Sequence, residues 1–302
     1  MRIGVTGATG FLGRYLVRHL VEQGHQCRCW FRPSSDRTGL IDNPADVEWC
    51  PGELGDLRGC QDLIDGCDAV VHAGLHRQGS TFRGAEDDPV AYVEKNVMGS
   101  LQLIEASRRA GVSRFVFVST CAVHEKILDD RTLDEAHPLW PTTLYGAYKA
   151  AVEKFVHSFG FGDGFPICAL RPTGIYGIAR PLQHSKWYPL IRSIVNNEPV
   201  HCDRGGKEVH VSDVARAIGL LLVAPEVAGE SFSCYDRYVS QFEVAELAKQ
   251  LAGSTSVITG NHTAPKHQIS VTKIERLGMR FGGIDVLTQT IAELVQQVRA
   301  TG

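Results

Sequence analysis

The sequence predicts an α/β fold built on a doubly wound parallel sheet, and two observations support that prediction. Short apolar runs rich in Val, Ile, Phe and Cys alternate with amphipathic stretches of helical length. The connections between them are short, and parallel strands buried on both faces have such continuous apolar sequences. We expect strands at residues 2–6, 26–31, 47–50, 69–72, 114–119 and 166–170, and helices at residues 11–23, 56–65, 89–110 and 142–158.

The alternation loosens after Pro172, where glycines, prolines and residues 196–199 indicate loops and turns. Helical patterns return at residues 212–223, 241–251 and 284–298. We therefore expect a first domain over residues 1–174, with returning elements near residues 208–236, and a smaller C-terminal lobe over residues 175–302. Because open α/β sheets bind ligands at their carboxyl edge, this lobe is expected to bind the substrate there.

Composition argues against several classes of function. Of the 302 residues, 43% are hydrophobic and 22% charged, as in ordinary globular proteins. The formal net charge of -3 gives no electrostatic reason to expect nucleic acid or an anionic membrane as partner. The nine cysteines are scattered without a C-x-x-C pair, and no apolar run approaches the ~20 residues of a membrane span. Since the first strand begins at Arg2 and leaves no room for a signal peptide, a cytoplasmic protein with a small-molecule substrate is expected.

A glycine-rich turn, GATGFLG from Gly7 to Gly13, joins the first expected strand to the first expected helix. Gly7 permits the tight turn, Gly10 lets the backbone approach a pyrophosphate, and Gly13 allows close contact between helix and sheet. The helix N-terminus offers free N–H groups and the positive end of its dipole to phosphates. Because it stands between a strand and a helix, the turn predicts dinucleotide binding, and hence a Rossmann fold.

A second motif runs from Tyr145 to Lys149, on the helix expected over residues 142–158. Four residues make about one helical turn, so the two side chains project from the same face. A lysine ammonium beside a phenol stabilises the phenolate and lowers a pKa that is ~10 when unperturbed. The pair therefore predicts a general acid/base that works near neutrality, although alone it also fits a surface pair. Tyr148 has the wrong offset from Lys149 for this role.

Together these motifs resemble the extended short-chain dehydrogenases/reductases, in particular the NAD(P)-dependent epimerase/dehydratase family. The resemblance runs from residue 1 to about residue 220 and is weaker beyond. Besides the glycine turn and the tyrosine–lysine pair, the matching segments are residues 55–57 (GDL), 72–74 (HAG), 96–100 (NVMGS), 119–124 (STCAVH), 171–177 (RPTGIYG) and 210–215 (HVSDVA).

The resemblance implies hydride transfer between a nicotinamide and a substrate carbon that bears oxygen. Tyr145 would exchange the hydroxyl proton, and Lys149 would depress the tyrosine pKa and bind the nicotinamide ribose. Thr120 would hydrogen-bond the substrate oxygen and stabilise charge as it develops. The family pattern also adds Asn96 to the expected catalytic set.

Departures from the family pattern bear on the reaction. Sugar dehydratases of the group follow the catalytic threonine with Asp-Glu, whereas this sequence has Cys121 and Ala122 and so lacks those acids. His124 replaces a tyrosine, and His124 and His76 either line the substrate pocket or are packed or solvent-facing. No grouping of His, Cys, Asp or Glu has metal-ligand spacing, so no metal is expected.

The end of the second expected strand bears on the choice of cofactor. NAD-selective proteins place an acidic residue there to hold the ribose hydroxyls, but this sequence has Phe31 followed by Arg32. A carboxylate would repel a 2′-phosphate, whereas an arginine binds it by charge-assisted hydrogen bonds. NADP is therefore the expected cofactor, with NAD, and an arginine merely exposed at a strand end, as alternatives. The expected cofactor contacts are Gly7, Thr9, Gly10, Phe11, Leu12, Gly13, Arg32, Asp56, Leu57, His72, Ala73, Gly74, Asn96, Tyr145, Lys149, Arg171, Pro172 and Thr173.

Three functions stay open at this point. The first is reduction of a carbonyl compound, or oxidation of an alcohol, as in dihydroflavonol or aldehyde reductases. The second is nucleotide-sugar epimerisation, although Arg204 and Lys207 match the family's diphosphate-binding arginine imperfectly. The third is a non-catalytic, dinucleotide-binding regulatory protein, and the presence of both Tyr145 and Lys149 argues against it. The resemblance also implies a homodimer formed by the helices at residues 89–110 and 142–158, unless their apolar positions face the sheet.

Overall fold

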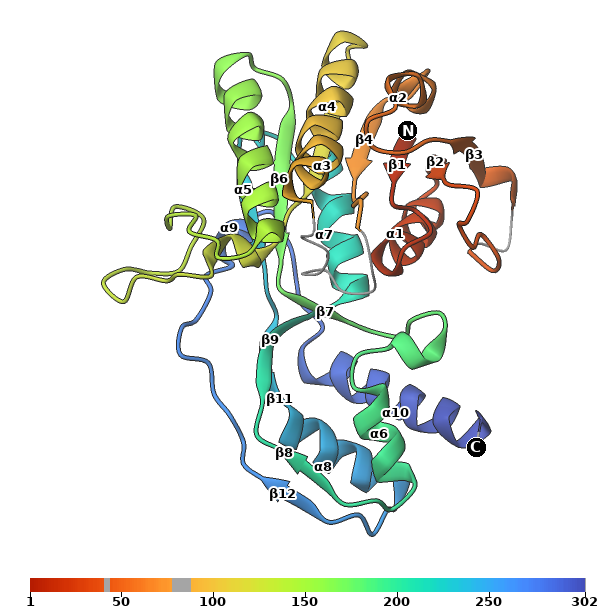
Figure 1. Ribbon diagram of the computed structural model, residues 1–302, viewed down its shortest axis with the longest axis vertical. Coiled ribbons are helices and arrows are strands. Elements are labelled where there is room, and N and C mark those ends of the chain that lie inside the picture. Colours follow the sequence, from red (N-terminus) through yellow and green to blue (C-terminus); the bar gives the residue numbers. More distant parts are fainter. Residues whose placement is uncertain (41–43, 78–87, 302) are drawn as a thin grey trace. The chain divides into compact units, whose positions relative to one another are not determined.

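The computed structural model describes residues 1–40, 44–77 and 88–301 (Figure 1). By its internal contacts the chain divides into two compact units. The first unit comprises Met1–Pro172, Val214–Cys234 and Ile269–Met279, and the second comprises Thr173–Asp213, Tyr235–Gln268 and Arg280–Gly302. Over the described ranges, no helix is both long and apolar enough to span a membrane.

A seven-stranded sheet forms the centre of the first unit, and all of its neighbouring strands run parallel. Its order is β3-β2-β1-β4-β5-β6-β10, so the chain changes direction across the sheet at the β1–β4 pair. This confirms the doubly wound Rossmann fold and adds β10 to the six expected strands. The strands are β1 (Arg2–Thr6), β2 (Gln26–Phe31), β3 (Val47–Pro51), β4 (Ala69–His72), β5 (Arg114–Val118), β6 (Ile167–Pro172) and β10 (Ser231–Cys234).

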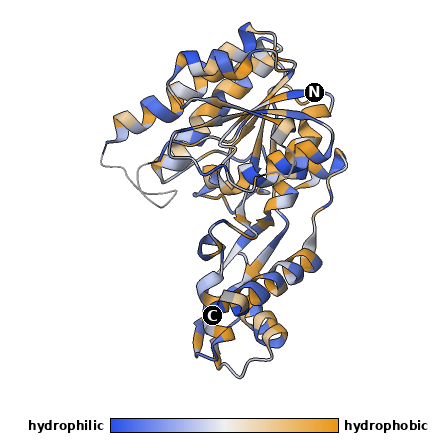
Figure 2. Cartoon of the chain, turned by 90° about the vertical axis from the view of Figure 1, so that its right-hand side faces the viewer, coloured by the Kyte–Doolittle hydropathy of each residue, from blue (hydrophilic) through white to orange (hydrophobic). Residues whose placement is uncertain are grey.

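Helices α2, α4 and α5 of this unit pack in a row, and His19 of α1 lies against Gly219 of α7 (Figure 1). An apolar core that includes Leu63, Leu103 and Phe117 fills the space between the sheet and the α2–α4–α5 row. In Figure 2 the helices alternate between apolar and polar residues, as amphipathic helices do. The helices are α1 (Phe11–Glu22), α2 (Leu57–Ile64), α3 (Pro89–Val93), α4 (Gly99–Arg109), α5 (Leu144–His157), α7 (Val211–Val223) and α9 (Thr272–Arg276).

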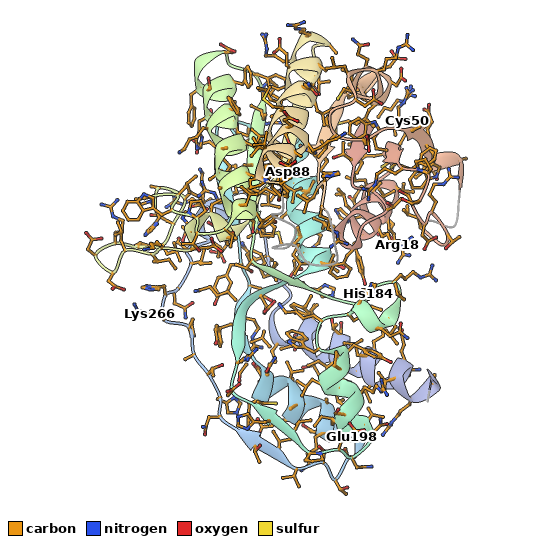
Figure 3. All side chains as sticks on the ribbon, in the orientation of Figure 1. Arg18, Cys50, Asp88, His184, Glu198 and Lys266 are labelled. Carbon is orange, nitrogen blue, oxygen red and sulfur yellow. The ribbon has the colours of Figure 1, made fainter. Side chains whose placement is uncertain are left out.

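The single helix expected over residues 89–110 is interrupted. Asp88, labelled in Figure 3, begins α3 by accepting a 2.9 Å hydrogen bond from the Ala91 amide. A π-helical turn over Glu94–Met98 then joins α3 to α4 and carries the buried Asn96. Such turns are rare and often occur at functional sites, and the 3.6-residue pattern of the sequence does not reveal this one.

The second unit has its own small core. Three helices, α6, α8 and α10, pack together, beside a three-stranded sheet of order β11-β9-β7 and a pair formed by β12 and β8. Tyr176, Ile191 and Ile291 are among its fully buried side chains. The elements are β7 (Gly174–Tyr176), α6 (Tyr188–Val195), β8 (Val200–Cys202), β9 (Gly205–His210), β11 (Arg237–Ser240), α8 (Gln241–Ala252), β12 (Ile258–Gly260) and α10 (Gly283–Thr301).

Candidate active site

The glycine-rich turn after β1 leaves no room for side chains. Gly7 has a φ of +73°, and a Cβ there would lie 2.7 Å from the carbonyl oxygen of Ala73. A Cβ on Gly13 would lie 2.1 Å from the carbonyl oxygen of Gly7. Gly10 begins α1 without any side-chain cap, so the first N–H groups of the helix are left for another acceptor. A bare backbone cradle at a helix N-terminus fits the pyrophosphate of a dinucleotide.

The loop after β2 is fastened to the first turn of α1. Arg14 donates to the carbonyl oxygens of Thr38 at 2.8 Å, Asp36 at 2.6 Å and Thr9 at 3.3 Å. It also pairs with the Asp36 carboxylate at 3.1 Å. The loop therefore has a defined position beside the glycine turn.

This loop brings two arginines to the end of β2. Arg32 is exposed, and its amide donates to Ser35 Oγ at 3.0 Å. The guanidinium of Arg37 lies over the Phe31 ring, 4.3 Å from its centroid, and 5.6 Å from that of Trp49. Sequence reasoning missed Arg37, because nothing in the sequence separates it from any other loop arginine. The rings of Phe31 and Trp49, 6.2 Å apart on the neighbouring strands β2 and β3, are the surface that Arg37 covers.

Asp56 and Leu57, two of the expected cofactor contacts, lie where α2 begins. Asp56 precedes α2 and makes no side-chain cap, and its Oδ2 lies 2.6 Å from the position of a Cβ on Gly59. Leu57, the next residue, is 59% exposed. Both residues are therefore at least partly exposed on the first unit. The Asp56 carboxylate does not cap the helix.

The ends of β1 and β4 meet at the sheet's change of direction. Thr6 lies opposite His72 in the register, and its hydroxyl accepts a 2.9 Å hydrogen bond from the amide of Gly74. Burial, together with the nearby charge of Lys149, lowers the pKa of His72 to about 3, so this imidazole is neutral. The stretch from His72 to Gly74 thus lies directly beside the glycine turn.

The three expected catalytic side chains Thr120, Tyr145 and Lys149 converge at the end of β5. The hydroxyls of Thr120 and Tyr145 share a hydrogen bond, and Thr120 Oγ1 also accepts one from the Ala122 amide at 3.1 Å. The Lys149 ammonium is buried, donates to the carbonyl of Val118 at 2.6 Å, and lies 6.0 Å from the Tyr145 ring centroid.

Burial sets the protonation of this group. It raises the pKa of Tyr145 above its ordinary value, and the hydrogen bond from Thr120 opposes the rise. It lowers the pKa of Lys149 to about 7, against the opposing charge of Glu153. The phenol is therefore protonated at neutral pH, as a proton donor has to be. The lysine changes charge near neutrality.

Asn96, also expected in the catalytic set, uses its side chain on backbone groups. Its side-chain amide accepts a hydrogen bond from the His76 amide at 2.9 Å and donates to the carbonyls of His76 at 2.9 Å and Tyr92 at 3.1 Å. Asn96 therefore holds the segment after β4.

Arg171, expected along the cofactor, uses its side chain inside the protein. It is 1% exposed, and Nε and Nη2 donate to the Glu153 carboxylate at 3.0 and 2.5 Å. Nη1 donates to the carbonyl of Glu135 at 3.1 Å. Glu153 also accepts hydrogen bonds from the hydroxyls of Ser119 and Ser231. The Arg171 guanidinium is thus a buried cation paired with Glu153. The Glu153 carboxylate in turn bonds Ser119, the residue before Thr120.

His124 is packed rather than part of an open pocket wall. It is 6% exposed, and burial lowers its pKa to about 4. Nδ1 lies 3.3 Å from the carbonyl of Pro138, and Nε2 accepts a hydrogen bond from Arg171 at 3.3 Å. Its ring meets that of His137 edge-on at 5.4 Å. Burial also raises the pKa of the Cys121 thiol to about 12, so this thiol is protonated at neutral pH.

The remaining expected contacts lie where the two units join in sequence. Pro172 ends β6 and is buried, and Thr173 begins the second unit. The Thr173 hydroxyl oxygen is buried and has no hydrogen-bond partner among the described residues. Over the same residues, no group of three or more His, Cys, Asp or Glu side chains is arranged to hold a metal.

Comparison with known proteins places this geometry in a family. The sequence profile of the NAD dependent epimerase/dehydratase family matches residues 3–234. The chain belongs to this family. The match includes the glycine turn, the Thr120–Tyr145–Lys149 group and all seven strands of the Rossmann sheet except the first residue of β1.

Members of the family similar to this chain differ in reaction. The putative dihydroflavonol 4-reductase of Synechocystis sp. is 30% identical over 272 residues, which are 88% of this chain and 74% of that protein. The structure of a dTDP-glucose 4,6-dehydratase from Streptomyces venezuelae, with NAD and TYD bound, has a TM-score of 0.79 at 25% identity and covers 99% and 98% of the two chains. The Thermus thermophilus UDP-glucose 4-epimerase complex with NAD has a TM-score of 0.79 at 24% identity over 99% of both chains, a likeness of fold.

Because members of this family are reductases, dehydratases and epimerases, the protein is an enzyme of the short-chain dehydrogenase/reductase type. Its cofactor is a nicotinamide dinucleotide. The bare backbone cradle from Gly7 to Gly13 is consistent with that cofactor.

Proposed function

We propose that this enzyme transfers a hydride between NADP(H) and a small carbonyl or alcohol substrate, with net reduction of the carbonyl, and that Tyr145 is the general acid/base. The observation that carries the proposal is the hydrogen bond between Tyr145 and Thr120, with Lys149 one helical turn along α5. When bound, the nicotinamide supplies the hydride. The residues of the chain do the rest.

Each side chain of the group has a distinct role. Thr120 and Tyr145 hold the substrate oxygen between two hydroxyls, and Tyr145 gives its proton to that oxygen as negative charge develops there. A tyrosine whose pKa burial has raised is protonated before the reaction, which suits reduction. Lys149 changes charge near neutral pH and can stabilise the phenolate that remains.

Two departures favour reduction over the other reactions of the family. Cys121 and Ala122 stand where sugar dehydratases have an acidic pair, and the Cys121 thiol stays protonated. In the segment expected to bind a substrate diphosphate, Arg204 and Lys207 match the family pattern imperfectly, and Glu208 is a buried carboxylate paired with Lys186. Epimerisation is the second candidate, because solved structures with this fold include UDP-sugar 4-epimerases.

A substrate panel distinguishes these functions. The protein is incubated with NADPH and, separately, ketones, aldehydes and nucleotide sugars, while NADPH is followed by its absorbance and sugars by chromatography. We expect NADPH to be consumed with at least one carbonyl compound. Inversion of a sugar without net loss of NADPH would replace our proposal with the epimerase. Absence of any turnover by a protein that binds the dinucleotide would favour a regulatory role.

The preference for NADP(H) is proposed to rest on two arginines, Arg32 and Arg37. Phe31 replaces the carboxylate that would repel a 2′-phosphate, and stacking on its ring holds Arg37 at the end of β2. We expect NADPH to bind more tightly than NADH. The variants R32A and R37A should each lose roughly tenfold in NADPH affinity and little in NADH affinity, since a charge-assisted hydrogen bond contributes about 1.5–3 kcal/mol.

Isothermal titration with NADPH, NADH, 2′,5′-ADP and 5′-ADP measures this preference. R18A is the matched control, because Arg18 is an exposed arginine on α1 (Figure 3). Tighter binding of NADH by the wild-type protein would overturn the NADP(H) preference. Equal losses of NADPH and NADH affinity in R37A would show that Arg37 does not recognise the 2′-phosphate.

We further propose that the second unit binds the substrate and that the enzyme works in the cytoplasm as a homodimer. Support for the dimer comes from α3 and the π-helical turn after it, where Val90, Val93 and Met98 are 68%, 38% and 47% exposed. Apolar side chains exposed at helical spacing are typical of helix–helix interfaces. Sedimentation velocity of the purified protein measures the oligomeric state directly.

A further inference from the structure

The start of α4 and the π-helical turn before it contact two segments of the first unit directly, the end of β4 with the residues after it and the loop before α2. Through His72 they are also linked by hydrogen bonds to a third segment, the end of β1. All three segments include or adjoin residues that are expected to contact the dinucleotide, so these contacts affect the geometry of the cofactor site.

The first contact is made by Asn96. Its amide accepts from the His76 N–H and donates to the His76 carbonyl, both at 2.9 Å. A side-chain amide that bonds both backbone groups of one residue fixes that residue as a β-ladder partner would. Asn96 itself is fully buried, so no water competes for these bonds.

The second contact is a chain of hydrogen bonds with a defined direction. The Gly74 amide donates to Thr6 Oγ1 at 2.9 Å, so the Thr6 hydroxyl proton is left to donate to His72 Nδ1 at 2.7 Å. The neutral imidazole then carries its proton on Nε2 and donates to Ser100 Oγ at 2.8 Å. The Ser100 hydroxyl donates to the carbonyl of Asn96 at 2.5 Å. Each of these buried donors has an acceptor.

The third contact depends on Gly99. A Cβ there would lie 2.8 Å from the amide nitrogen of Gly55 and 2.9 Å from Cβ of Leu54. The first residue of α4 therefore packs directly against the loop that carries Asp56. No other residue type fits at this point without moving that loop.

We infer that Asn96, Gly99 and Ser100 are positioning residues for the cofactor: this one helical turn sets the relative placement of the three segments that contact the dinucleotide. The inference rests on the proposed cofactor site. It assigns Asn96 a role through His76 rather than contact with the reacting atoms. It also explains the π-helical turn, which places Asn96 and Ser100 so that one bonds His76 and the other His72.

The test compares two serines of α4. Ser100 and Ser107 are both fully buried, and each donates to the carbonyl four residues earlier, but only Ser100 also bonds His72. S100A should therefore lose more thermal stability than S107A, because it also removes the acceptor of the buried His72 Nε2–H. We expect S100A to bind NADPH about tenfold more weakly than the wild type and S107A to bind it normally. Titration by NADPH fluorescence gives both affinities without any substrate.

N96A should weaken NADPH binding at least as much as S100A. N96D, which keeps the acceptor for His76 N–H and loses the donor, serves if N96A fails to fold. Hydrogen exchange of the amides of Gly74 and His76 should speed up in the Ser100 and Asn96 variants and not in S107A. Equal NADPH affinity in S100A and S107A would overturn the inference. Failure of the wild-type protein to bind either dinucleotide would instead overturn the proposed cofactor site.

Discussion

Replacing Tyr145 by phenylalanine is expected to lower kcat at least about 100-fold while changing cofactor affinity little. The variant Y145F keeps the ring that packs near Lys149 and Tyr148 and removes the proton and the hydrogen bond to Thr120. Steady-state rates with the substrate found in the panel, together with titration of NADPH, separate the two quantities.

A second tyrosine on the same helix provides the control. Tyr148 is 1% exposed, its ring lies 6.5 Å from that of Tyr145, and it contacts Phe117 in the core. Because its hydroxyl is buried and makes no hydrogen bond with Thr120, Y148F should keep most of the activity. Near wild-type kcat in Y145F would remove Tyr145 from its role, and loss of activity in Y148F alone would transfer that role to Tyr148.

Loss of Arg171 is expected to have the largest effect on stability. R171M leaves the Glu153 carboxylate buried without its cation, and breaking such a pair typically costs about 3–5 kcal/mol. The double variant E153L/R171M removes both charges and should recover much of that loss. Chemical denaturation of the three proteins, followed by circular dichroism, measures the difference.

An exposed ion pair provides the comparison for the stability lost in R171M. The Arg109 side chain is 76% exposed and pairs with Glu105 along α4, so R109A should cost less than about 1 kcal/mol. If R171M is no less stable than R109A, the buried Arg171–Glu153 pair does not stabilise the folded protein. A double variant as unstable as R171M alone would show that lost packing, and not the unpaired charge, causes the effect.

The parts of this enzyme that the sequence predicts are those encoded locally. The glycine turn needs only a strand before Gly7 and a helix after Gly10, and Tyr145 and Lys149 need only one helical turn between them. Six of the seven strands are rich in apolar residues, although Arg28 interrupts β2 and Glu48 interrupts β3. In β10, residues 231–234, serines alternate with Phe232 and Cys234. So short a segment with two polar residues does not predict a fully buried strand.

The parts that the sequence does not predict depend on contacts between distant elements. Glu153 on α5 pairs with Arg171 on β6. The spacing of residues in the sequence does not reveal this pairing, so the sequence alone predicts Arg171 as a cofactor contact. The stacking of Arg37 on Phe31 depends on how Arg14 fastens the intervening loop. Likewise, the π-helical turn at Asn96 follows from its bonds to His76, twenty residues earlier in the chain.

The backbone around Gly7 is closely packed, whereas the loop after β2 is largely exposed. A Cβ at Gly7 would collide with the backbone at Ala73, and one at Gly13 with the carbonyl of Gly7, so the phosphate cradle cannot vary without moving two strand ends. The loop that carries Arg32 and Arg37 is largely exposed, and Arg14 bonds it to the cradle. On our proposal that these two arginines bind the 2′-phosphate, protein engineers who wish to exchange one nicotinamide coenzyme for the other can redesign that loop and leave the reaction chemistry intact.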